Sequence, residues 1–371
     1  MQIKIAIVAF FCVSGFGQEA GPKAGVQPVR IVFFRPSDLS IPAGVQQRIT
    51  SIANYAESFF EQGMTRNGYA PAVKKLFRRE ENGEVEVLFV QGEHTAASGK
   101  YAKPDYAAAV ADQAGRQYQL PQDTKIFWIF IYLGDRPVRF QDWAGLGDAR
   151  RGGWAMINYD TVAGEIRQDL HMTEEFNFEY KLKSTIHELA HALGLPHMGP
   201  DPTLGLGNSL MGPNPPGYAT RNYPNPDRVY LSTSEAAMLW KHPLFSGVPM
   251  GPAQDPKVKL ADYRSTYDAA SGVVTISAKV SAGQRPHSAV VIDNRGDNDP
   301  YWSRTYAARV AADGTFQIRI NDPAKANGCY LILFCFENGM VSGDGAHFAF
   351  DNRGEIRKGY TFRDGAFQFE E

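Results

Sequence analysis

Residues 187–197 read HELAHALGLPH, and no other stretch limits the possible folds of this chain as strongly. His187 and His191 are four residues apart, so on a helix their imidazoles project from one face, one turn apart. Two such nitrogens can bind one zinc ion at about 2.0–2.1 Å. Gly194 favours a left-handed conformation that ends the helix, which lets His197 return as a third ligand. Because the chain has only 8 histidines, three of them within this stretch indicate a metal site rather than an ordinary solvated helix.

Glu188 gives this stretch its expected chemistry. Three protein nitrogens leave the fourth zinc position open for water, as catalytic zinc sites require. Zinc lowers the pKa of a bound water to about 7, and Glu188, which neighbours the first ligand, is placed to take its proton. The stretch therefore predicts hydrolysis of a carbonyl compound, with Glu188 as general base and with three metal ligands, His187, His191 and His197.

The pattern H-E-x-x-H-x-x-G-x-x-H, followed by Met211 in NSLMG, resembles the metzincin clan of zinc endopeptidases. The resemblance implies an α+β catalytic domain over residues 28–247, with a twisted mixed sheet, an active-site helix below it and a smaller lower subdomain. It also implies that Met211 forms the Met-turn, an apolar floor beneath the metal, and is structural rather than a ligand.

Two positions depart from the markers that distinguish families within this clan. Met198 follows the third histidine, where the residue often identifies the family. Pro213 stands two residues after Met211, where some metzincins place a tyrosine that assists at the metal. Tyr218 and Tyr223 are candidate replacements, and are otherwise loop aromatics. The subfamily and the group that stabilises the oxyanion therefore stay open.

Hydrophobic periodicity predicts the framework around the motif. The run TKIFWIFIYL at 124–133 is almost continuously apolar, as in a central strand covered on both faces. Apolar residues within 41–63 recur at helical spacing. This order indicates a mixed sheet that carries helices. The other expected elements are strands at 29–36 and 84–90 and helices at 102–118, 180–195 and 231–244, the last with a capping box of Ser232 and Glu235.

Three segments near the motif bear on substrate binding. The glycine-rich residues 144–153 read first as a flexible connection and alternatively as the rim of a cleft. The short strand at 154–159 is expected to be an edge strand, which can pair with an extended peptide. Residues 199–228, rich in proline, glycine and asparagine, read as a long loop beside the metal, and loops of such length are usually functional or disordered.

Beyond residue 247 the sequence changes character. The proline-rich stretch 248–257 reads as a linker. Residues 258–371 read as an all-β, immunoglobulin- or fibronectin-III-like sandwich, because short strand-like runs recur at regular spacing. These runs lie at 273–280, 288–293, 305–311, 315–320, 329–336 and 347–351. Cys329 and Cys335 share one run and would lie about 20 Å apart along it, so we expect buried thiols rather than a disulfide.

The first residues predict export. Lys4 precedes an apolar core at 5–13, and small residues follow, so residues 1–17 read as a secretory signal peptide. We therefore expect a secreted or periplasmic protein. No later segment is long and apolar enough to span a bilayer. The formal net charge is −2 with no long run of one sign, so neither nucleic acid nor an anionic membrane surface is an expected partner.

These observations leave three functions to compare. The first is a secreted, monomeric zinc endopeptidase with a protein or peptide substrate, whose C-terminal domain binds protein or glycan. The second is a cell-surface or glycan-binding protein with a vestigial zinc domain, against which the intact Glu188 argues. The third is a zinc hydrolase that acts on a non-peptide amide or ester.

A second cation is a weaker expectation. Asp293, Asp297 and Asp299 offer the oxygen ligands that calcium uses. Their spacing does not fit an EF-hand, however, so a solvated turn is the preferred interpretation.

Overall fold

The computed structural model describes residues 25–370 apart from 102–105, 124, 136–142, 251–255, 296–299 and 343–353. The predicted signal peptide at 1–17 and the predicted strand at 347–351 thus lie outside the described residues. Among the described residues, no helix combines the length and apolar character needed to cross a membrane.

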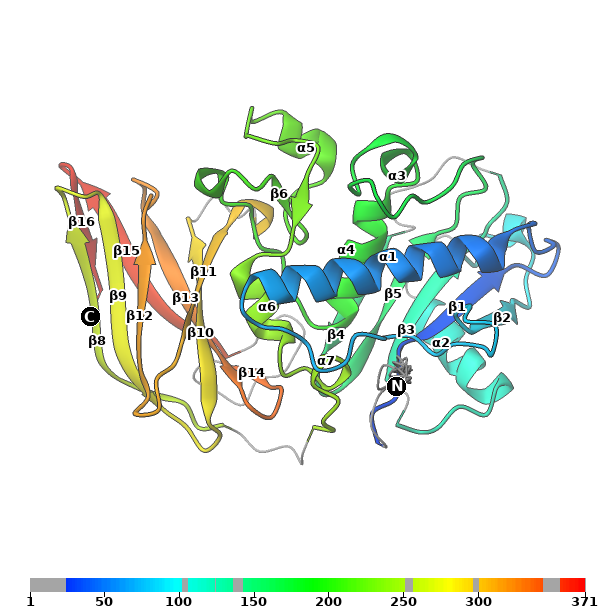
Figure 1. Ribbon diagram of the computed structural model, residues 1–371, viewed down its shortest axis with the longest axis horizontal. Coiled ribbons are helices and arrows are strands. Elements are labelled where there is room, and N and C mark those ends of the chain that lie inside the picture. The colour runs from blue at the N-terminus through cyan, green and yellow to red at the C-terminus, as the bar shows by residue number, and fades with distance from the viewer. Residues whose placement is uncertain are drawn as a thin grey trace, which may run out of the picture.

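A five-stranded sheet, in the order β2-β1-β3-β5-β4, supports the N-terminal part (Figure 1). Its first four strands are parallel, and β4 runs antiparallel to β5. The prediction of a central strand covered on both faces is confirmed by β3. Its residues Trp128 and Phe130 face one core, and Ile129 and Ile131 the other. The strands are β1 Arg30–Arg35, β2 Val87–Gln91, β3 Ile126–Ile131, β4 Ala144–Asp148 and β5 Gly152–Asn158.

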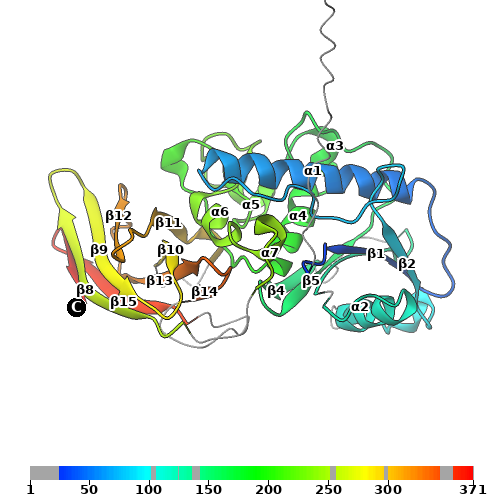
Figure 2. The ribbon, with the colours of Figure 1, turned by 60° about the horizontal axis from the view of Figure 1, so that its bottom comes forward.

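Helices cover both faces of this sheet (Figure 2). The long α1, Val45–Arg66, and α4, Leu182–Ala192, share the core on one face. On the other face lies α2, Tyr106–Gln117. The predicted capping box is confirmed, because Ser232 and Glu235 form it at the start of α6, Thr233–Leu239. Shorter elements are α3 Glu175–Glu179, α5 Pro215–Ala219, α7 Pro243–Ser246, β6 Asn208–Ser209 and β7 Val229–Tyr230.

The C-terminal part is an antiparallel sandwich, as expected. A sheet in the order β11-β10-β13-β15-β16, with β14 beside β13, faces a sheet in the order β12-β9-β8. Both sheets bury alternate residues in a common core, such as Ile276 and Ile318 from one and Val291 and Ile332 from the other. The strands are β8 Lys259–Asp268, β9 Val273–Ser281, β10 Pro286–Asn294, β11 Arg304–Arg309, β12 Thr315–Ile320, β13 Gly328–Phe336, β14 Val341–Ser342, β15 Ile356–Arg363 and β16 Ala366–Phe369.

The larger sheet of the sandwich is covered on its second face by the N-terminal part. Val290, Ile292, Leu333 and Cys335 lie in the same apolar cluster as α1, α4 and α6. In Figure 1, β10 and β11 stand directly beside α6. Cys329 and Cys335 are both buried and form no disulfide with each other, as predicted. The two parts therefore share one continuous core, although the boundary at 248–257 stays a prediction.

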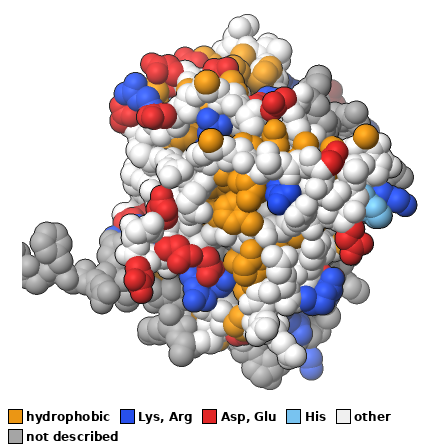
Figure 3. Space-filling view, turned by 90° about the vertical axis from the view of Figure 1, so that its right-hand side faces the viewer, with side chains coloured by type: hydrophobic (Ala, Val, Ile, Leu, Met, Phe, Trp, Pro, Cys, Tyr) orange, Lys and Arg blue, Asp and Glu red, His pale blue; other side chains and the backbone are white. Residues whose placement is uncertain are grey.

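Charges of both signs mix on the end of the molecule near β1 and β2. Figure 3 shows apolar side chains gathered in the middle of this face, with acidic and basic side chains interspersed around them. The described side chains thus form no continuous basic surface on this face of the kind that would attract nucleic acid.

Candidate metal centre

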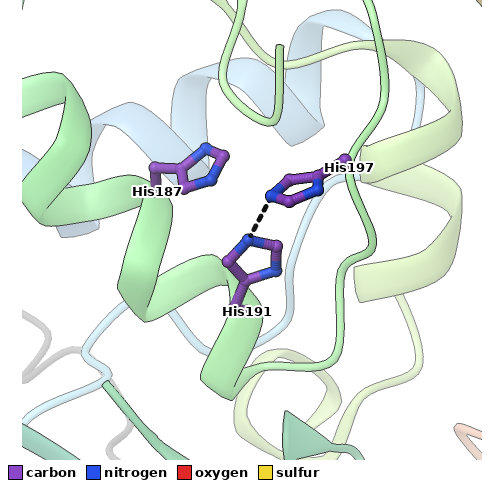
Figure 4. Close-up of side chains that lie close together, drawn as sticks. All are labelled: His187, His191 and His197. Carbon is purple, nitrogen blue, oxygen red and sulfur yellow. Dashed lines mark hydrogen bonds between the residues drawn. The ribbon is translucent and has the colours of Figure 1, made fainter. Parts of the chain in front are cut away.

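Three imidazoles converge where α4 ends (Figure 4). His187 and His191 project from consecutive turns of α4, as their spacing predicts. Gly194 follows the helix with φ +94°, and the chain turns back to bring His197 opposite them. One ring nitrogen from each histidine lies within 4.8 Å of the other two. The structure thus brings together the three residues predicted from the sequence.

Hydrogen bonds on the far side of two rings orient them for a metal. His187 Nδ1 lies 2.8 Å from the carbonyl oxygen of Leu210, and His191 Nδ1 lies 2.8 Å from that of Leu195. A carbonyl can only accept, so each Nδ1 donates its hydrogen and each Nε2 keeps a lone pair. His191 Nε2 and His197 Nε2 lie 3.0 Å apart. This arrangement fits a divalent cation such as zinc.

Burial keeps the imidazoles of His187 and His197 neutral, which is the form that binds metal. Desolvation lowers the pKa of His187 well below its usual value, and nearby Lys183 and His191 lower it further. Desolvation also lowers the pKa of His197 to about 3, helped by the charges of His191 and Lys183. His187 and His197 are therefore unprotonated over the whole neutral range.

Glu188 lines a cavity beside the triad. The cavity has a volume of about 690 Å³, and His187, Ser184 and Pro213 also line it. Burial raises the pKa of Glu188 to about 8, while the Lys183 charge opposes this shift. A cation held by the histidines would favour the charged carboxylate and draw this pKa down again. Glu188 and His187 thus line the same cavity.

Met211, the predicted Met-turn residue, directly follows Leu210, whose carbonyl contacts the His187 ring. Met211 is fully buried, and its carbonyl oxygen accepts a hydrogen bond of 3.2 Å from the backbone N–H of Met198. The Met198 carbonyl in turn accepts from Ser209 Oγ at 2.8 Å. Met198 therefore pairs the segment after the third ligand with the turn. Pro213 uses its carbonyl to accept from Asn208 Nδ2 at 2.8 Å.

Two buried ionisable groups that the sequence analysis did not connect with this turn, Lys183 and Glu235, hold it in place. Lys183 Nζ, on α4, donates to the carbonyls of Gly212 at 2.6 Å and Pro213 at 2.9 Å. The Glu235 carboxylate, on α6, accepts from the backbone N–H of Met211 at 2.9 Å. Both side chains are almost completely buried. The spacing from Lys183 to His187 places both on one helix face, but nothing in the sequence indicates the carbonyls that receive the lysine.

The prediction that residues 154–159 form an edge strand is wrong. β5 lies inside the sheet, between β3 and β4. The expected flexible connection at 144–153 instead contains β4, the terminal strand. Its residues Gly145 and Gly147 line a cavity of about 380 Å³ together with His191 and His197, so the alternative reading as a cleft rim is supported. Glycines obscured the strand in the sequence because they have low strand propensity.

Those glycines allow β4 to touch α4. A Cβ atom on Gly145 would lie 2.7 Å from the Cβ of His191, and one on Gly147 would overlap the carbonyl oxygen of Ala192. Only a strand without side chains at these positions can lie this close to the helix. The backbone of β4 is thereby held beside the metal ligands.

Replacing Gly147 by alanine should therefore move β4 away from α4 and lower the free energy of unfolding by about 1–3 kcal/mol, the usual cost of overpacking. Chemical denaturation measures this change. Gly115→Ala is the matched control. Gly115 lies in α2 with open space where a Cβ would be, so its replacement should stabilise by about 0.5–1 kcal/mol. Equal effects from the two variants would contradict the close contact at Gly147.

Residues 199–228 are more ordered than a plain loop. They contain a 3₁₀ turn at Pro202–Leu204, β6 and α5, and β6 pairs with β7. Tyr218 is fully buried and donates to the carbonyl of Pro224 at 2.8 Å, while Tyr223 packs against Tyr218. Neither tyrosine lines the cavity beside the triad.

The contacts of Asp293 do not support a calcium site at this residue. Asp293 is buried, and its carboxylate accepts a hydrogen bond from the Tyr360 hydroxyl and lies 3.6 Å from Arg295. Asp297 and Asp299 lie outside the described residues. The expectation of a solvated turn is thus wrong at Asp293.

Comparison with known proteins identifies similar structures. No family model and no curated protein matches the sequence. Catalytically inactive OgpA from Akkermansia muciniphila, in complex with an O-glycopeptide substrate (glycodrosocin), matches with a TM-score of 0.65 at 16% identity, over 92% of this chain and 98% of that chain. Wild-type OgpA matches with a TM-score of 0.65 at 17% identity, over 92% and 99%. The likeness extends over both parts of the chain and, at this identity, shows a shared fold.

Proposed function

We propose that this protein is a secreted, zinc-dependent endopeptidase of the metzincin type, in which Glu188 is the general base. The convergence of three imidazoles, one of which lines a cavity together with Glu188, carries the proposal. A vestigial metal domain would not need a carboxylate at the open side of the triad.

Each residue has a role in this reaction. His187, His191 and His197 would hold the zinc ion through their Nε2 atoms. When bound, zinc supplies a Lewis acid that polarises the scissile carbonyl and acidifies water. Glu188 takes the proton from the attacking water and passes it to the leaving amine. The terminal strand β4 offers main-chain groups to an extended substrate, which would lie along the cleft.

O-glycopeptides are the substrate class to test first. OgpA, which has the same fold, binds an O-glycopeptide substrate. The cavity beside Glu188 lies within the usual size range of ligand sites and carries both polar and apolar side chains, including Lys181, Ser184, Asn214 and Pro215. Such a lining suits a substrate with both peptide and sugar groups.

Mass spectrometry on paired peptides tests the proposal. Each pair has one sequence, with and without an O-glycan on one serine or threonine. We expect the zinc-loaded protein to cleave the glycosylated member faster, and a chelator to stop cleavage. Equal cleavage rates for both members would contradict a preference for O-glycosylated peptides but would still support a peptidase. Intact peptides throughout, with zinc bound, would contradict the peptidase and favour a binding protein.

A further inference from the structure

The C-terminal sandwich is attached too firmly to behave as a separate module. Besides the shared apolar core, Tyr69 Oη lies 3.0 Å from Ser288 Oγ. The Arg309 guanidinium lies 3.8 Å from the centre of the Tyr69 ring and 4.2 Å from that of Trp240. These contacts join the sandwich to the N-terminal part along α6, so the sandwich keeps a fixed position relative to the metal centre.

One segment of the sandwich, η4 at Pro300–Trp302, reaches the third histidine. The backbone N–H of Gly199, two residues after His197, donates to the carbonyl of Ser303 at 2.6 Å. A Cβ atom on Gly199 would overlap the backbone of Trp302. The chain that carries His197 is therefore docked directly on η4.

The Tyr301 ring stacks on the His197 imidazole. The two ring centres lie 3.7 Å apart with an angle of 29° between the planes. The next residue, Trp302, lies 3.8 Å from the Arg221 guanidinium and also contacts Tyr223. Trp302 thus joins η4, which carries Tyr301, to the loop at 199–228.

At His197, the Tyr301 ring takes the place of the backbone carbonyl groups that orient the other two imidazoles. The Nδ1 atoms of His187 and His191 each meet a backbone carbonyl. His197 has no such acceptor for its Nδ1 atom among the described residues. The orientation of its ring depends instead on the face that Tyr301 covers.

Segment η4 also divides the space around the triad. Tyr301 and Trp302 line the larger cavity, with His187 and Glu188. Pro300 and Ser303 line the smaller one, beside β4. The sandwich therefore contributes to the walls of both cavities that flank the metal ligands.

We propose that the sandwich is an integral part of the metal centre and that Tyr301 is a positioning residue, whose ring holds the His197 imidazole in the orientation that binds zinc. The proposal rests on the zinc site of the proposed function. Loss of an outer residue that orients a ligand typically weakens metal affinity by about 10–100-fold. The ring face, not the hydroxyl, makes the contact.

Zinc affinity, measured by competition with a chromophoric chelator, tests this role without reference to a substrate. We expect Tyr301→Ala to weaken zinc binding at least about tenfold and Tyr301→Phe to keep it. Gly199→Ala, which pushes η4 away and leaves Tyr301 unchanged, should also weaken it. Tyr267→Ala is the control, because Tyr267 is a half-buried aromatic on β8 in the far sheet and packs on Phe367.

The outcomes are distinguishable. Wild-type affinity in Tyr301→Ala would overturn the positioning role, and so would equal losses in Tyr301→Ala and Tyr267→Ala. If Tyr301→Ala does not fold, the Gly199→Ala result decides. A wild-type protein that binds no zinc would instead contradict the metal site of the proposed function, and a zinc-binding protein that cleaves nothing would contradict only the peptidase.

Discussion

Replacing Glu188 by glutamine should slow peptide cleavage by about 10²–10⁴-fold, the usual contribution of general acid–base catalysis. Glutamine has nearly the shape of glutamate but cannot take the proton from the attacking water. The three histidines are untouched, and His187 and His191 keep their carbonyl partners, so zinc binding should persist. Cleavage rates at saturating substrate and the metal content of the purified variant measure the two quantities separately.

A matched control separates the base from the general loss of one negative charge. Glu165 is exposed on the N-terminal part, and Glu165→Gln should cleave like the wild type. A Glu188→Gln variant that cleaved within a few-fold of the wild type and retained its zinc would show that another group accepts the proton. Loss of activity together with loss of zinc would indicate that Glu188 is needed for zinc binding rather than for proton transfer.

The ligand cluster was predictable from the sequence because its geometry is local. His187, His191 and Gly194 follow from helix spacing and helix termination, and His197 lies only six residues beyond His191. The central strand β3 was equally clear, since a strand covered on both faces must be apolar throughout. In each case the physical cause lies within one short stretch of the chain.

The predictions that failed depend on contacts between distant segments. The sequence did not predict β4, because the glycines that allow this strand to contact α4 are also typical of a flexible loop. Tyr301 lies more than a hundred residues after His197 in the sequence and reaches it only because the sandwich packs along α6. Its neighbours carry no catalytic motif, so nothing in the sequence connected it with the metal.

The contacts that join α4 and α6 to the turn at Met211 could not be predicted from the sequence for the same reason. Burial lowers the pKa of Lys183 to about 7, and the Glu235 and Glu188 carboxylates oppose this shift. Burial raises the pKa of Glu235 to about 7, while backbone N–H groups of Ser232 and Met211 and the Lys183 charge oppose it. The charge on each of Lys183 and Glu235 thus favours the charge on the other.

Replacing Lys183 by methionine should therefore lower the free energy of unfolding by about 1–3 kcal/mol, the usual cost of leaving a buried hydrogen-bonding group without its partner. Methionine fills a similar volume but leaves the Gly212 carbonyl without its donor and the Pro213 carbonyl with only Asn208 Nδ2. It also leaves Glu235 buried without a positive neighbour. Urea denaturation of the metal-free protein measures this loss without a contribution from zinc binding.

A surface ion pair provides the contrast. Lys74 Nζ lies 2.6 Å from Glu61 Oε1, and the two side chains are 43% and 35% exposed. Lys74→Met should therefore cost only about 0–1 kcal/mol. If Lys183→Met cost no more than this, Lys183 would not hold the Met-turn.

The double variant Lys183→Met/Glu235→Gln tests whether the two residues act together. If their charges support each other across the turn, the double variant should lose less stability than the sum of the two single variants. The difference is the coupling energy, for which residues in one hydrogen-bond network typically give about 0.5–3 kcal/mol. Strictly additive losses would mean that Lys183 and Glu235 fix the turn independently. In that case the carbonyl contacts of Lys183 alone would account for its effect.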